Sequence, residues 1–111
     1  MRRVIFGKLK NFFSFFGSFG TSGGKWVSGA LATNGKIYCI PFNSTQVLVI
    51  DPSNNTTSLF GSFSGSGKWV GGVLAPNGKI YCVPHESTQI LVIDPSNNTT
   101  SLFGNLSGIY K

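Results

Sequence analysis

Few side chains in this chain of 111 residues could carry acid–base or metal chemistry, because it has one histidine and three acids. His85 and Glu86 are adjacent and could together transfer a proton or hold a cation. Asp51 and Asp94 each open the sequence DPSNN, in which an aspartate side chain bonds to the backbone of a turn. With one histidine and isolated cysteines, we predict no catalytic residues, no metal site and no cofactor.

Aromatic and loop side chains at equivalent places in two copies of one sequence could bind a ligand instead. His85 and Glu86 stand where an earlier copy of the same sequence has Phe42 and Asn43. Each copy also begins with Lys-Trp, and a tryptophan ring can stack on a sugar or fill the space between two sheets. An unconstrained surface loop is the alternative for the loop residues. The candidate ligand face comprises Phe42, Asn43, His85, Glu86, Trp26 and Trp69.

The two copies cover most of the chain. Residues 25–61 and 68–104 align without a gap, 43 positions apart, and 30 of the 37 aligned residues are identical. Identity at this level indicates a recent duplication, so we do not take it as evidence of functional constraint.

Each copy has the pattern of four short strands. WVSGALA (26–32) and KIYCIP (36–41) flank Asn34-Gly35, which predicts a hairpin with a two-residue type I′ turn. VLVI (47–50) is apolar throughout, so we expect it to be covered on both faces. Proline in DPSNN ends this strand because it has no amide hydrogen, and TTSLFG (56–61) is the fourth strand. The second copy repeats these strands at 69–75, 79–84, 90–93 and 99–104.

Four strands every 43 residues are typical of the blades of a β-propeller. The string GKIY, followed by VLVID and NTT, is similar to the propeller repeats known as YVTN repeats, and it also resembles Kelch-type blades. The resemblance covers Lys25–Gly104. It implies an all-β fold, a partial β-propeller of about two and a half four-stranded antiparallel blades. It implies no activity, since this fold hosts enzymes, lectins and scaffolds.

The chain divides into three parts on this basis. Phe15–Phe19 aligns with Leu59–Phe63, so residues 4–19 resemble the last two strands of a degenerate preceding blade. We therefore predict a half blade and linker at 1–24, a first blade at 25–67, and a second blade with a tail at 68–111.

A propeller ring closes with about four to eight blades, so two and a half blades cannot close one. The sheets at the two ends would then expose apolar faces and strand edges. We expect self-association, further blades of a longer array of which this chain is a fragment, or an open stack. Two-blade chains of small fucose-binding lectins form such rings as trimers, but their sugar-binding motifs are not visible here, so the likeness concerns architecture alone.

The composition disfavours several other classes of partner. Of nine Lys and Arg, four fall in the first ten residues and the rest are single, so the net charge of +6 forms no basic stripe for nucleic acid. No apolar run approaches the 18 residues of a membrane span.

Cys39 and Cys82 occupy equivalent positions in the two copies. Equivalent positions lie about 10 Å apart in stacked sheets, which is too far for a disulfide. Several Asn fit the glycosylation sequon through turn chemistry alone, and the cellular compartment is not indicated.

We therefore expect a non-enzymatic module for binding or structural assembly, with a protein or a glycan as its ligand. One alternative is an oligomeric, lectin-like carbohydrate-binding propeller. The other is a propeller-type lyase or hydrolase, which would need polar side chains at the ring centre.

Overall fold

The computed structural model describes residues 15–107, and these form eight β-strands and no helix. The strands build two four-stranded antiparallel sheets, in the orders β1-β2-β3-β4 and β5-β6-β7-β8. The all-β prediction, with four strands in each copy, is confirmed. The strands are β1 (Trp26–Leu31), β2 (Ile37–Pro41), β3 (Val47–Asp51), β4 (Thr56–Phe60), β5 (Trp69–Leu74), β6 (Ile80–Pro84), β7 (Ile90–Asp94) and β8 (Thr99–Phe103).

In the strand that is apolar throughout, side chains on both faces are buried, although each sheet packs against the other on one face only. In β7, Leu91, Val92 and Ile93 are all buried although successive side chains point to opposite faces. Its equivalent β3 buries Val47 and the two residues after it in the same way. A strand of this kind has no face to offer water, so each sheet needs a cover on both sides.

The first hairpin of each copy differs from the predicted two-residue type I′ turn. Gly35 N donates to Ala32 O at 3.0 Å and Ala32 N to Lys36 O at 2.9 Å, which encloses a three-residue loop. Gly35 has φ +84°, whereas Asn34 is not among the residues with positive φ. This is a type I turn followed by a left-handed glycine, the usual three-residue hairpin. Asn34 Oδ1 accepts a hydrogen bond from Lys36 N at 2.9 Å, which explains why asparagine is suited to a position with negative φ.

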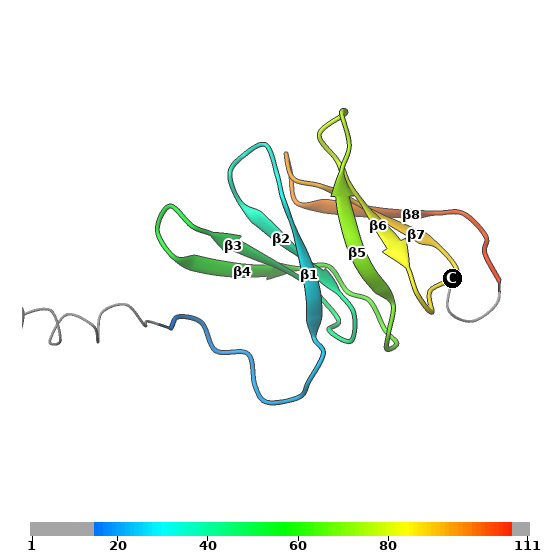
Figure 1. Ribbon diagram of the computed structural model, residues 1–111, viewed down its shortest axis with the longest axis horizontal. Helices are drawn as coiled ribbons and strands as arrows, with labels where there is room; N and C mark the ends of the chain where they lie inside the picture. The colour runs from blue at the N-terminus through cyan, green and yellow to red at the C-terminus, as the bar shows by residue number, and fades with distance from the viewer. Residues whose placement is uncertain (1–14, 108–111) are drawn as a thin grey trace, which may run out of the picture.

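The two sheets stack face to face, with β1 and β5 next to one another (Figure 1). We call the face that the first sheet turns to the second its back face, and the face that the second sheet turns to the first its front face. Both faces enter one continuous core. The back face of the first sheet contributes Ala30, Tyr38, Ile40, Val47, Val49 and Phe60, and the front face of the second sheet contributes Trp69, Leu74, Ile80, Cys82, Leu91 and Ile93.

Isoleucine side chains at the centre of this interface leave no room for a side chain on Gly72. A Cβ there would lie 2.8 Å from Ile40 Cδ1 of the first sheet and 3.0 Å from Ile80 Cγ2. Glycine at this position therefore allows the two sheets to approach closely. Polar contacts at both ends of the interface, described below, fix its register.

The predicted half blade lies for the most part outside the described residues and stays a prediction. Residues 15–24 contain no strand, but they repeat two features of the linker between the sheets. Gly17 has φ +85° as Gly61 has +90°, and Phe19 packs edge-on against Trp26 as Phe63 packs against Trp69. The tail from residue 108 is likewise not described.

Both cysteines are free and buried, and burial raises the pKa of the Cys82 thiol to about 12 from its ordinary value of 9.0. The unfolded chain therefore releases this proton first as the pH rises, so stability present below pH 9.0 is lost between there and about pH 12. We expect the urea midpoint to fall over this range, and Cys82→Ala to flatten the fall. Equal pH slopes in the two proteins would contradict the assignment.

Candidate functional site

The predicted ligand-face residues gather at one end of the two sheets, on the β2–β3 loop (42–46), the β6–β7 loop (85–89) and the first residues of β1 and β5. Phe42 and His85 lie against one another with ring centroids 5.7 Å apart and an angle of 17° between the planes. The two loops that differ in sequence are thus stacked across the interface between the sheets. The stack places Phe42 and His85 at the junction of the sheets, where each covers the other.

Asn43 and Glu86 both adjoin Gly67, on the linker between the sheets. Gly67 N donates to Asn43 Oδ1 at 2.8 Å, and Glu86 N donates to Gly67 O at 2.9 Å. Gly67 has φ +60°, and a Cβ there would lie 3.2 Å from the Glu86 carboxyl carbon. Asn43 therefore bonds the linker from the first sheet, while Glu86 holds it from the second.

Both tryptophans are held in place by polar and aromatic contacts. Trp26 Nε1 donates to Gln46 O at 2.8 Å, and Trp69 Nε1 donates to Gln89 O at 2.9 Å. Phe63 meets Trp69 edge-on with centroids 5.3 Å apart, and Trp69 is only 3% exposed. Trp69 thus fills the space between the sheets, and a sugar ring could not stack on it without displacing its neighbours.

Beside each tryptophan lies an open cavity, and the two cavities occupy equivalent places in the two copies. The cavity at Trp69 has a volume of about 630 Å³, and the one at Trp26 about 620 Å³. Sequence reasoning missed most of the lining, because its Ser, Thr and Gln residues look like ordinary turn residues. Lining residues of the first cavity include Phe63, Ser66, Lys68, Glu86, Thr88 and Gln89.

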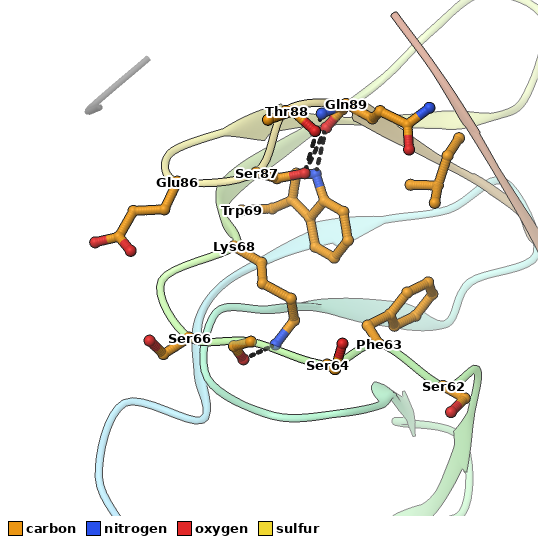
Figure 2. Close-up of a pocket in the computed structure, with 12 residues that line it drawn as sticks. Ser62, Phe63, Ser64, Ser66, Lys68, Trp69, Glu86, Ser87, Thr88 and Gln89 are labelled. Atoms are coloured by element: carbon orange, nitrogen blue, oxygen red, sulfur yellow. Dashed lines mark hydrogen bonds between the residues drawn. The ribbon is translucent and has the colours of Figure 1, made fainter. Parts of the chain in front are cut away.

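Lys68 is a buried cation on the floor of this region, 5% exposed. Its ammonium donates to Gly65 O at 2.7 Å and to Phe42 O at 3.3 Å, and burial lowers its pKa. Figure 2 shows the Lys68 ammonium turned toward Gly65 of the linker, whereas the Glu86 carboxylate points away from that ammonium. Lys68 therefore ties the linker to the first sheet and is not poised as a catalytic base.

The aspartates that could have formed an acid–base pair serve the turns that follow β3 and β7. Asp94 Oδ1 accepts from Ser96 N at 3.0 Å and from Ser96 Oγ at 2.7 Å, and Asp51 makes the same two bonds with Ser53. Within residues 15–107, no three His, Cys, Asp or Glu side chains come together as a metal ion would require. Nor does that part of the chain hold a helix able to cross a membrane.

At the opposite end of the interface, Tyr38 bonds the first sheet to the second. Tyr38 Oη donates to Asn98 Oδ1 at 2.6 Å and lies 3.4 Å from Pro95 O. Asn98 has φ +54°, a left-handed conformation that asparagine tolerates, and this presents its side chain to Tyr38. Asn34 Nδ2 donates to the same tyrosine oxygen at 3.2 Å.

The back face of the second sheet has no cover among the described residues. Val73 is 63% exposed where the equivalent Ala30 is 9% exposed, and Val83 is 46% exposed where Ile40 is fully buried. An apolar cavity of about 250 Å³ opens on this face. It is lined by Val73, Tyr81, Cys82, Val83, Pro84, Ile90 and Phe103.

Comparisons of the chain with protein-family models, with curated proteins and with solved structures find no match. The geometry of the described residues is therefore the ground on which a function can be argued.

The serine hydroxyl and then the serine amide lower the pKa of each turn aspartate. This contribution to stability is present above the ordinary value of 3.8 and is lost as the pH falls through the lowered pKa. We expect Ser96→Ala to return the pKa of Asp94 toward 3.8 while that of Asp51 stays low. Carboxyl NMR titration measures both groups in one sample, and an unchanged Asp94 would show that another group sets its pKa.

Proposed function

We propose that this protein is a non-enzymatic β-propeller repeat module, of the YVTN or Kelch kind, that works by assembly. Its four-stranded sheets are blades, and the exposed back face of the second blade receives the front face of a further blade. The exposed face carries this proposal, because the equivalent face of the first blade is covered by a blade of nearly the same sequence.

The size of the apolar patch supports an interaction surface. Val73, Val83 and Phe103 stand on one sheet face with the cavity between them, and each keeps more than a third of its surface exposed. Isolated exposed valines are ordinary on proteins, but a contiguous apolar face marks a site of association.

The two alternatives gain less support from the geometry. A lyase or hydrolase needs a proton donor and acceptor converging on a substrate, whereas Asp51 and Asp94 are engaged in turns and His85 is stacked on Phe42. A carbohydrate-binding function is favoured by the two equivalent cavities, with their serine, threonine and glutamine linings. Burial of Trp69 removes the aromatic platform from one of the two cavities. Binding of monosaccharides to the whole chain, measured by ligand-detected NMR, tests this second candidate.

Fusing a further unit in tandem tests the assembly proposal. In the extended chain, a second set of residues 62–107 follows Gly104, as Ser62 follows Gly61 in the natural linker. We expect the extended chain to unfold at a higher urea concentration and to bind less of a hydrophobic dye per blade, because the back face of the second blade becomes buried.

Val83→Asp in the second blade should abolish this gain in stability, since it places a charge in the new interface. Ser64→Asp, in the exposed linker, is the matched control and should leave the gain intact. An extended chain no more stable than the original would mean that the back face does not receive a blade.

A further inference from the structure

We propose that the back face of the second sheet binds the front face of a second copy of this chain, head to tail. The inference rests on the proposed function, since it names the partner that the exposed face receives. The interface between the two sheets of one chain serves as its template, because it shows which front-face residues cover a back face of this kind.

The apolar surfaces match this arrangement. The six apolar front-face positions of the second sheet have the same residue types in the first sheet, so a second copy presents the same apolar side chains on its front face. Among residues 15–107, nothing covers this face of the first sheet completely, since Leu31 is exposed and Ile37 and Ile50 are partly exposed. The front-face residues of the first sheet are Trp26, Leu31, Ile37, Cys39, Leu48 and Ile50.

The differences between the copies fall instead on the back face and on its loops. Of the seven differing positions, three lie on the back face, where Ala30, Ile40 and Val47 correspond to Val73, Val83 and Ile90. Each replacement keeps an aliphatic side chain, so the uncovered face stays as apolar as the covered one. One front face can therefore bind both back faces.

A hydrogen bond at one end of the interface has its groups in place on both surfaces. Tyr81 Oη receives a bond from Asn77 at 3.0 Å, as Tyr38 Oη does from Asn34, but Tyr81 lies on the uncovered face. Its counterpart Tyr38 donates to Asn98. In a second copy the equivalent acceptor is Asn55, which shares the left-handed conformation with φ +57° and is exposed. Tyr81 of one copy would therefore donate to Asn55 of the next.

At the end of the interface near the linker, a charge distinguishes the contact between copies from the contact within a chain. Within the chain, Asn43 Oδ1 accepts from Gly67 N, and the adjoining Lys68 N donates to Phe42 O at 2.9 Å. Between copies, Glu86 stands in the place of Asn43, opposite Gly24 and Lys25 of the neighbour. A carboxylate would thus meet a backbone amide beside a lysine, which is a more favourable pairing than the amide of Asn43 provides.

A front-to-back contact is heterologous, so both faces of every copy are used and the assembly either closes into a ring or grows. Counting the two described sheets as two blades, the usual four to eight blades of a ring give about two to four copies. This distinguishes the proposal from a two-fold dimer, in which back face meets back face and Glu86 does not meet Lys25.

Complementation between two charge-reversed full-length chains tests the proposal. Glu86→Lys sets two cations against one another at the contact, and Lys25→Glu sets two carboxylates there. Each variant alone should therefore associate at least about tenfold more weakly than the original chain. In an equimolar mixture every alternating contact is again between opposite charges, so association should return to the original strength. Because a ring of three copies cannot alternate, the mixture would then form an assembly with an even number of copies. Sedimentation velocity over a range of concentrations measures all three samples, and circular dichroism confirms that the variants fold.

Two further variants make the outcome specific. Tyr81→Phe removes the hydrogen bond to Asn55 and should weaken association by about fivefold without loss of chain stability. Asn97→Asp changes the net charge by one in the exposed turn between β7 and β8, at the end of the second sheet opposite Glu86, and should have no effect on association.

The possible failures separate this inference from the proposed function. An original chain that assembles while the mixed variants do not complement would overturn the head-to-tail contact and leave assembly through the back face standing. A chain that stays monomeric, together with a stable tandem chain, would overturn the second copy as partner and favour further blades of a longer array. Failure of both experiments would overturn both proposals.

Discussion

A four-stranded sheet whose central strand is apolar on both sides cannot remain folded alone in water, and the rest of this molecule depends on that constraint. Burial of each large aliphatic side chain contributes about 1.5–3 kcal/mol, whereas a single intramolecular hydrogen bond contributes about 1 kcal/mol. Stacking of the sheets through residues such as Ile40, Ile80 and Leu91 therefore dominates their stability. The polar contacts at Tyr38 and Gly67 select the register in which the faces meet.

The local structure was largely predictable because period and turn chemistry act over a few residues. The apolar runs on either side of Asn-Gly, the run VLVI and the segment TTSLFG located every described strand, and the sequence DPSNN located the turns that Asp51 and Asp94 open. The hairpin at Asn34 was wrong in detail. Asn-Gly suits both a two-residue loop with two left-handed residues and a three-residue loop with one, and the bond from Lys36 N to the Asn34 side chain favours the second.

The sequence predicted that sheets at the ends would expose apolar faces, but it did not show which of the two equivalent back faces would be exposed. Ile40 and Val83 differ by one methylene, yet one is buried and the other is nearly half exposed, because only the first has a sheet in front of it. Residue type cannot carry this information when the copies are nearly identical. The candidate site shows the same limit, since the stack of Phe42 on His85 and the bond from Gly67 to Asn43 arise between loops far apart in the sequence.

Near-identity of the two sheets also affects how the chain reaches its folded state. The front face of the second sheet packs equally well against a back face of its own chain or of another chain. Domain swapping, the exchange of whole units between chains, therefore competes with correct folding. The linker from Gly61 to Lys68 counters this by holding the two sheets at a high effective concentration. Its glycines at 61, 65 and 67 all have positive φ, so a side chain introduced there would strain the path of the linker. Shortening this segment, or straining it with a side chain at one of these glycines, would thus shift the population from monomers toward domain-swapped chains.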